Sequence, residues 1–332
     1  MDENVKRKIL EIKNLHVEYR SDFGTTHAVN GLDLSIEEGE AMGLVGESGS
    51  GKTTTALSVL RLLPKEVGKQ TDGEIYYDGT LLSDLSEKKM RNLRGNKISM
   101  IFQNPLTSLN SVFTIGEQIA MVYQKHSHMG RKEAYEKAGE ILEKVGIPKT
   151  RLFEYPHQFS GGMRQRVGIA AGLACNPDLL IADEPTTALD VTIQLQILQL
   201  LKNLQAEYRT SLLMITHNLG IVAELCSKVS VMYAGEIVES GPVKQVFQAP
   251  KHPYTIGLLN ALPKASGGCN RLAAIEGSAI GANNLERGCR FHPRCEHCME
   301  ICKCSTPPVV EIEDGHKVRC HLLAGRGDTD AE

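Results

Sequence analysis

A strand, a glycine-rich loop and a helix follow one another in the segment AMGLVGESGSGKTTTALSVLRLL, and this order restricts the fold more than any other feature of the chain. The apolar residues 42–45 predict a short buried strand, and helix-forming residues follow the loop. Gly46, Gly51, Lys52 and Thr53 occupy every fixed position of the phosphate-binding loop pattern. Such loops place backbone amides and a helix N-terminus around phosphate groups. The segment therefore predicts an α/β fold with a phosphate-binding loop.

The phosphate loop is expected to use both its backbone and two of its side chains. Lys52 would reach the β- and γ-phosphates of a nucleotide, and the Thr53 hydroxyl would bind Mg²⁺. A Gly/Ser loop that fits the pattern by chance is the alternative, and the preceding strand argues against it. The residues predicted to contact nucleotide are Gly46, Glu47, Ser48, Gly49, Ser50, Gly51, Lys52, Thr53 and Thr54.

Two carboxylates follow a second apolar strand in the segment DLLIADEPTTALD. Residues 179–182 predict the strand, which ends at Asp183 and Glu184. We expect Asp183 to hold Mg²⁺ through water and Glu184 to polarise the attacking water. Neighbouring residues of a strand point to opposite faces, so each carboxylate suits only one of the two tasks. A pair of exposed acids at a strand end is the alternative.

The composition is that of a globular protein and narrows the classes of partner. Of 332 residues, 41% are hydrophobic and 23% are charged, which excludes a wholly disordered chain. The net charge of −3 gives no basic field, so no nucleic-acid partner is expected. The first fifteen residues have no apolar signal core, and no apolar run reaches the roughly 20 residues needed to cross a bilayer. We therefore expect a soluble chain in the cytosol.

The N-terminal region predicts paired strands. Apolar residues alternate over residues 15–19 and again over residues 32–36, as in half-buried strands. Asn30 and Gly31 precede the second stretch and predict a turn before it.

The segment FSGGM provides a second candidate anion site. Ser160 stands where an N-cap would, two glycines follow, and a helical pattern comes next. Here the chain resembles the ATP-binding-cassette (ABC) ATPases, whose signature sequence caps the γ-phosphate of nucleotide bound to the opposite subunit. Ser160, Gly161 and Gly162 match the core of that signature. Phe159 and Met163 depart from its commonest form at the first and last positions.

Further residues resemble functional residues of the same family, in the same order along the chain. Tyr19 resembles the aromatic that stacks on adenine, with a buried strand aromatic as the alternative. Gln103 resembles the glutamine that contacts Mg²⁺ and the attacking water. Asp190 resembles the residue that communicates across the dimer, and His217 resembles the switch histidine at the γ-phosphate. The resemblance implies catalytic roles for Glu184, His217, Gln103 and Lys52.

The resemblance covers about residues 8–245 and implies the whole architecture. The fold class is α/β, a P-loop NTPase cassette with a RecA-like core, an antiparallel β subdomain and a helical subdomain at about residues 104–160. The nucleotide-binding domain is expected over residues 1–245, and a small Cys-rich extension over residues 246–332. ATP and Mg²⁺ would be sandwiched between two cassettes, identical or paralogous.

Two functional classes compete for such a cassette. One is the energising subunit of a membrane transporter, bound to permease subunits through its helical subdomain at the cytoplasmic face of the membrane. An extracytoplasmic substrate-binding protein would then take part indirectly. The other class is a soluble ATPase of translation or DNA repair. The chain has one phosphate loop, no internal repeat and no heptad run, which favours transport.

Segments beyond the cassette resemble the ATPases of oligopeptide and dipeptide importers. The segment VFQAPKHPYTIGLLNALP and the earlier NPLTSLN are typical of that group, which predicts import of peptides. Importers of nickel and other solutes share much of the pattern and remain the alternative. We expect His252 and Tyr254 to pack the start of a helix rather than to form a site.

Cysteines concentrate near the C-terminus, where six of the nine fall between residues 289 and 320. In a reducing cytosol such clusters indicate metal binding before disulfides. The resemblance implies that Cys289, Cys295, Cys302 and Cys320 hold a [4Fe–4S] cluster in a module at about residues 285–323. Tetrahedral zinc and unliganded thiols are the alternatives. Two further thiols, Cys298 and Cys304, leave the ligand set open.

Overall fold

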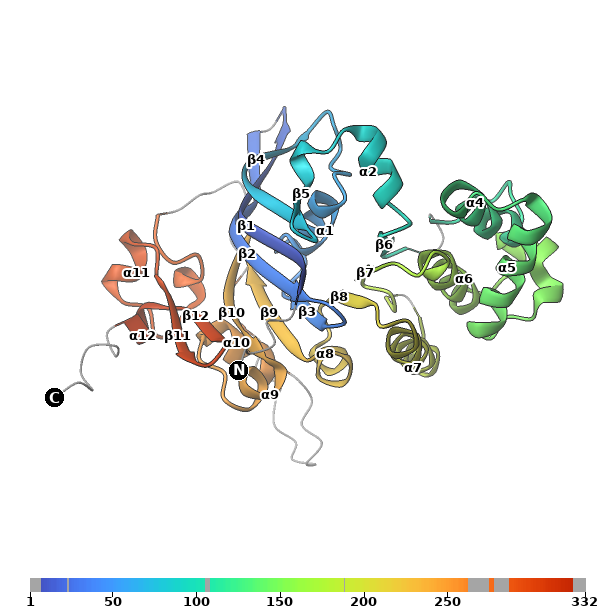
Figure 1. Cartoon of the computed structure of the whole chain (residues 1–332). Coiled ribbons are helices and arrows are strands. Elements are labelled where there is room, and N and C mark those ends of the chain that lie inside the picture. The colour runs from blue at the N-terminus through green and yellow to red at the C-terminus, as the bar shows by residue number, and fades with distance from the viewer. Residues whose placement is uncertain are drawn as a thin grey trace, which may run out of the picture. The chain divides into compact units, whose positions relative to one another are not determined.

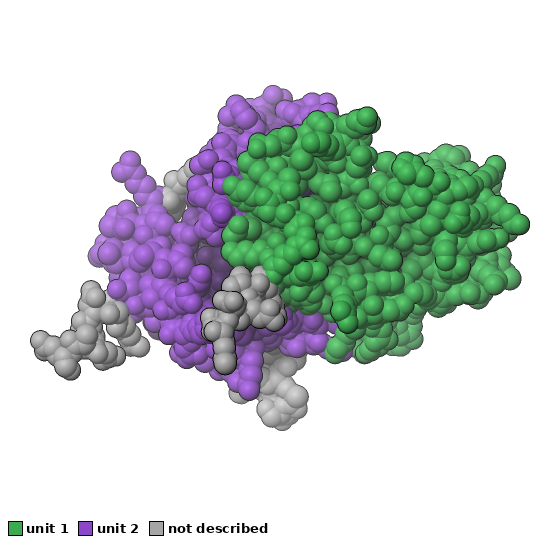
Figure 2. Space-filling model, in the orientation of Figure 1, with its two compact units in different colours: residues 1–11, 35–41, 76–215 green, residues 12–34, 42–75, 216–332 purple. Residues whose placement is uncertain are grey.

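The computed structural model describes residues 7–22, 24–104, 108–187, 189–261, 275–277 and 287–324. It divides into two compact units, each built from segments distant in sequence (Figure 2). Unit 1 comprises residues 1–11, 35–41 and 76–215, and unit 2 comprises residues 12–34, 42–75 and 216–332. The predicted domain boundary at residue 245 falls inside unit 2 and stays a prediction. Most of the segment between residues 262 and 286 lies outside the described residues.

Three parallel strands form the sheet of unit 1 (Figure 1). They are β6 (Ile98–Ile101), β7 (Leu179–Asp183) and β8 (Ser211–Thr216), with β7 in the middle. β7 and β8 are buried along their whole length, as expected of unbroken apolar strands that are covered on both faces. Asp183 pairs in register with Ile215, so the carboxyl ends of these two strands meet at one edge.

Helices make up most of the rest of unit 1. The helices α4 (Ile115–Ser127) and α5 (Arg131–Lys144) are amphipathic, because their buried residues recur at three- and four-residue spacing, as at Ile115 and Ile119. Both pack on each other and on the short 3₁₀ helix η2. The helical elements are α2 (Glu87–Leu93), α4 (Ile115–Ser127), α5 (Arg131–Lys144), α6 (Gly161–Leu173), α7 (Val191–Tyr208), η1 (Leu82–Asp84), η2 (Lys149–Phe153) and η3 (Pro156–Gln158).

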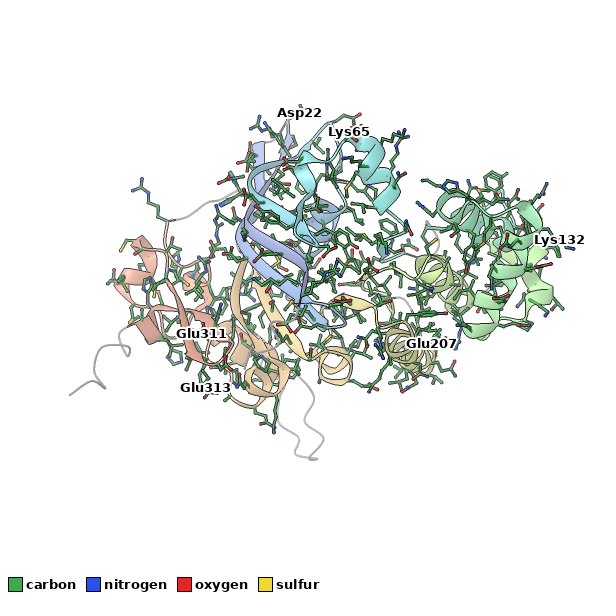
Figure 3. The ribbon with its side chains drawn as sticks, in the orientation of Figure 1. Asp22, Lys65, Lys132, Glu207, Glu311 and Glu313 are labelled. Atoms are coloured by element: carbon green, nitrogen blue, oxygen red, sulfur yellow. The ribbon has the colours of Figure 1, made fainter. Side chains whose placement is uncertain are left out.

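The main sheet of unit 2 joins the strand before the phosphate loop to the C-terminal part of the chain. β3 (Ala41–Val45) pairs in parallel with β9 (Lys228–Tyr233). The sheet then continues antiparallel through β10 (Glu236–Pro242) and β12 (His316–Arg319) to the outer strand β11 (Val309–Glu313). Glu311 and Glu313 are exposed on this outer strand (Figure 3).

An antiparallel sheet with the strand order β2-β1-β4 completes the strands of unit 2. The strands are β1 (Lys8–Ser21), β2 (Gly24–Glu37) and β4 (Gly68–Tyr77); β5 (Thr80–Leu81), in unit 1, pairs with the end of β4. The predicted alternation is confirmed, but the predicted turn at Asn30 and Gly31 is wrong. β2 runs through both residues, because Asn30 is held by hydrogen bonds with the carbonyls of Ala234 and Gly235 while Gly31 takes a φ of 67°.

The helices of unit 2 include α1 (Lys52–Val59), α8 (Leu219–Leu225), α9 (Val243–Gln248) and α10 (Pro253–Asn260). Residues 287–324, here named the tail module, contain η4 (His292–Arg294), α11 (Glu300–Cys304) and α12 (His321–Ala324) besides β11 and β12. Tyr233, Tyr254 and Phe291 form one aromatic cluster with ring centroids 4.7–5.4 Å apart. The tail module therefore shares its core with β9 and α10.

Candidate active site

The phosphate loop follows β3 and is shaped by glycines that no other residue can replace. A Cβ on Gly46 would lie 2.1 Å from the Met232 carbonyl oxygen, and one on Gly51 would lie 2.3 Å from the Ala28 carbonyl oxygen. Both glycines have positive φ, 155° and 105°. Close backbone approach and left-handed φ each demand glycine. The loop thus turns directly from the buried strand β3 into the start of α1.

Lys52 begins α1 and bends its side chain back over the loop. Its Nζ donates to the carbonyls of Gly46 and Glu47, at 2.8 Å each. Ser48 and Thr53 are exposed. Tyr19 lies beside the same helix, where its hydroxyl is 3.3 Å from Thr54 Oγ1. In this arrangement Lys52 is buried against the loop that it is predicted to serve.

The predicted carboxylates and Gln103 come together in unit 1. Asp183 ends β7 and is 2% exposed. Glu184 follows it with a φ of 45°, and its Oε2 accepts from Gln103 Nε2 at 2.7 Å and from Thr187 Oγ1 at 2.9 Å. A left-handed non-glycine residue costs on the order of 1–3 kcal/mol and is most often found at functional sites. Two hydrogen bonds aim the Glu184 carboxylate.

The signature segment caps helix α6. Ser160 Oγ accepts from the Met163 amide at 3.4 Å, which confirms the predicted N-cap. A Cβ on Gly162 would lie 2.6 Å from Ile193 Cγ2, so the start of α6 packs directly on the start of α7. Asp190 caps α7 by accepting from the Ile193 amide at 2.9 Å. Ser160 and Asp190 are both exposed, so their caps are presented outward.

One arginine contacts both residues that depart from the common signature. Arg151 Nη1 donates to Met163 Sδ at 3.3 Å, and its Cζ lies 4.3 Å from the centroid of the Phe159 ring. Glu154 holds the same guanidinium at 2.6–3.0 Å. The sequence did not predict this role of Arg151, because the signature pattern specifies no residue that packs against it.

His217 lies just after β8 and is exposed. The following residue, Asn218, caps α8 by accepting from the Gly220 amide at 2.9 Å. His252 and Tyr254 pack the start of α10, as predicted. His252 Nδ1 accepts from the Tyr254 amide at 3.1 Å, and both side chains are buried.

Glu47 is the loop residue whose contacts the sequence did not predict. Its amide donates to the Tyr254 hydroxyl at 3.0 Å. Its carboxylate accepts two hydrogen bonds from the Arg294 guanidinium, at 3.0 and 3.2 Å. No local pattern links these residues, because 207 and 247 positions separate them from Glu47.

The predicted ligand cysteines gather in the tail module. Cys302 and Cys320 are buried, and the Cys289 amide donates to the Cys302 carbonyl at 2.8 Å. Burial is the main cause that raises the pKa of Cys289 to about 12, and the nearby thiols of Cys302, Cys320 and Cys295 contribute to the same rise. The extra thiols, Cys298 and Cys304, are exposed. Within the described part of the chain, however, no three His, Cys, Asp or Glu side chains are grouped so as to hold a metal ion.

Comparison with known families divides the chain in the same way as its motifs. Residues 29–187 match the model of the ABC transporter family, and residues 238–302 match that of the oligopeptide/dipeptide transporter C-terminal region. None of the helices among the described residues combines the length and apolar character needed to span a membrane.

Relatives and solved structures agree with this division. The chain is 48% identical to the oligopeptide transport ATP-binding protein AppD of Bacillus subtilis, over 96% of this chain and 98% of that protein. It is 45% identical to the dipeptide transport ATP-binding protein DppD of the same organism, over 97% and 96%. A dimeric post-hydrolysis structure of the ATP-binding cassette MJ0796 with ADP and Pi superimposes with a TM-score of 0.64 at 30% identity, covering 70% of this chain and 98% of that one. The chain therefore belongs to the ABC transporter ATPases and resembles the peptide-importing group within them.

Proposed function

We propose that this chain is the ATP-hydrolysing subunit of an importer that carries dipeptides or oligopeptides across the cell membrane. One observation carries the proposal: a single chain joins an ABC transporter cassette to the oligopeptide/dipeptide transporter C-terminal region. The relatives named for peptide transport match this chain over nearly its full length. The subunit would work at the cytoplasmic face, held there by permease subunits.

The site residues have separate roles in this proposal. Bound MgATP would supply the β–γ phosphoanhydride bond that is hydrolysed. Lys52 and the loop amides hold the phosphates, and Tyr19 faces the adenine. Thr53 and Asp183 supply the hydroxyl and carboxylate oxygens that Mg²⁺ prefers. Glu184 takes up the proton of the attacking water, and Gln103 fixes the orientation of its carboxylate through their hydrogen bond.

The remaining site residues would act across a dimer of cassettes. Ser160, Gly161 and Gly162 offer an exposed helix start that suits the γ-phosphate of a nucleotide held by the opposite subunit. Asp190 accepts a hydrogen bond from the amide of Ile193, whose side chain packs against Gly162. A movement of the signature segment would therefore also move Asp190. His217 is exposed and would contact the γ-phosphate from its own subunit.

The permease would dock on the helical part of unit 1. Val112 and Phe153 are 75% and 71% exposed there, and Phe113 is 38% exposed. Large apolar side chains exposed together indicate a surface that another protein covers. An extracytoplasmic binding protein would deliver the peptide to that permease.

We further propose that Cys289, Cys295, Cys302 and Cys320 hold a [4Fe–4S] cluster that staples the tail module. These four thiols influence one another electrostatically, as the pKa values of Cys289, Cys295 and Cys320 reflect. Each iron of a cluster takes its own thiolate, so the ligands need not converge on one point. Zinc requires four ligands within about 2.3 Å of one ion, and the described residues contain no such group.

Two experiments test these proposals. Uptake of a labelled tripeptide should require this chain when it is co-expressed with its permease subunits, and Lys52→Ala should abolish uptake; transport of nickel alone would contradict the peptide assignment. Anaerobically purified protein should absorb near ~400 nm and contain matched iron and sulfide. Cys289→Ser should remove that absorption, whereas Cys298→Ser and Cys304→Ser should retain it. Stoichiometric zinc would contradict the cluster.

A further inference from the structure

The tail module reaches the phosphate loop through one buried arginine. Arg294 precedes Cys295 at the end of η4, and its side chain is 6% exposed. Its two terminal nitrogens donate to the two carboxylate oxygens of Glu47, at 3.0 and 3.2 Å. This paired geometry fixes the carboxylate in orientation as well as in position. Glu47 is the second residue of the phosphate loop.

Other contacts hold Arg294 in place. Its Nε donates to the Glu276 carbonyl at 3.1 Å, and its guanidinium carbon lies 5.8 Å from the centroid of the Tyr233 ring. Tyr233 in turn packs edge-on against Phe291 and Tyr254. An arginine held by this many partners loses little further entropy when it binds a carboxylate.

All three polar groups of Glu47 are thereby engaged. The amide donates to Tyr254, the carboxylate accepts from Arg294, and the carbonyl accepts from Lys52. Two of these partners lie beyond residue 245, and the third is the lysine predicted to bind the phosphates. Lys52 must leave the Glu47 carbonyl in order to turn toward nucleotide. The position of that carbonyl is therefore fixed by the C-terminal part of the chain.

We propose that Arg294 is a positioning residue of the nucleotide site: through Glu47 it holds the phosphate loop in the form that binds ATP. The inference rests on the proposed role of the loop. Charged hydrogen bonds of this strength correspond to roughly a tenfold change in affinity. Removing Arg294 should therefore weaken ATP binding while leaving Glu184, which acts on the attacking water, unaffected.

The chain supplies a matched control in Arg290. This arginine lies in the same module with its side chain 11% exposed, and its Nε donates to Glu236 Oε1 at 2.8 Å. It anchors the tail module to β10 without a contact to the loop. Arg290→Ala should therefore destabilise the tail module about as much as Arg294→Ala does, while the position of Glu47 is unchanged.

The test measures the dissociation constant of a non-hydrolysable ATP analogue, in the presence of Mg²⁺, for the full-length chain. Arg294→Ala should raise it about tenfold, Arg294→Lys by less, and Arg290→Ala by under about twofold. The KM for ATP should rise with Arg294→Ala while kcat stays within about twofold. Glu47→Gln should weaken binding too, and adding it to Arg294→Ala should give no further loss, because both changes remove one interaction.

The outcomes separate this inference from the function on which it rests. The inference would be overturned if Arg294→Ala and Arg290→Ala raised the dissociation constant of the analogue equally. It would also be overturned if the effects of Glu47→Gln and Arg294→Ala on that constant were additive. If Arg294→Ala does not fold, the comparison of Arg294→Lys with Arg290→Lys decides in the same way. Lys52→Ala binding the analogue as tightly as the unaltered chain would instead refute the assignment of the loop itself.

Discussion

The side-chain amide of Gln103 donates to the Glu184 carboxylate at 2.7 Å, although 81 positions separate the two residues. Thr187 donates to the same oxygen at 2.9 Å. Both donors bind one oxygen of the carboxylate and fix its orientation. A change that moves Gln103 therefore also moves the carboxylate that we propose as the base.

Glu184→Gln tests this arrangement. The amide keeps the shape of the side chain but cannot take a proton, so phosphate release should fall by about 10²-fold or more. The affinity for ATP should be retained, since Glu184 is not assigned to binding. Phosphate release and nucleotide binding measured on the same preparation check both expectations. Steady-state hydrolysis at the unaltered rate would show that another group is the base.

Arg151→Ala tests the support beneath the signature. Met163 and Phe159 would both lose their shared cationic partner, so Ser160 would cap α6 less firmly. ATPase activity that depends on the dimer should fall about fivefold, while ATP binding to the isolated subunit stays unchanged. Lys149→Ala is the control, because the Lys149 side chain is 67% exposed and its ion pair with Glu143 spans 3.9 Å. A similar loss of activity in both variants would contradict the role of Arg151.

The buried His252 predicts that stability falls in acid. Burial lowers its pKa from 6.5 to about 3, so below pH 6.5 the unfolded chain binds a proton that the folded chain does not. The contribution to stability is complete above pH 6.5 and declines as the pH falls, by about 2–3 kcal/mol at pH 4.5. Urea unfolding at both pH values measures it. His252→Asn can still cap α10 but does not titrate, so its stability should depend less on pH over this range; an identical pH dependence would refute the assignment.

Glu239 joins the tail module to the loop before α10. We therefore predict that removing its carboxylate lowers the stability of the fold strongly. This fully buried carboxylate accepts from the amides of Lys251 and His252, at 2.8 and 2.9 Å, and lies 2.8 Å from His316 Nε2. Glu239→Ala leaves these buried donors without an acceptor and should cost about 3 kcal/mol or more. Glu313→Ala is the control, because Glu313 is an exposed carboxylate on β11 of the same module (Figure 3). Thermal unfolding that shifts equally in both would contradict the prediction.

The parts of the site that follow local patterns could be predicted from the sequence. Gly46 and Gly51 are needed for the backbone path of one short segment, and Ser160 caps the helix that starts next to it. The family resemblance added Gln103, whose spacing alone is unremarkable. Each of these predictions depends on residues close in sequence or on a complete set of motifs in order.

The parts that depend on distant contacts could not be predicted. Asn30 and Gly31 have the composition of a turn, yet contacts with Ala234 and Gly235 keep them in a strand. Nothing in the residues around Glu47 indicates that an arginine 247 positions later binds it.

The assembly of the phosphate loop also has an order in time. β3 needs β9 beside it, the Glu47 amide needs Tyr254, and the Glu47 carboxylate needs Arg294. A ribosome makes the loop early and its last partner nearly 250 residues afterwards, at about 5–20 residues per second. The emerging cassette therefore lacks part of its nucleotide-binding framework until the tail has left the ribosome, so we expect the newborn subunit to reach its full affinity for ATP only after the C-terminal module has emerged.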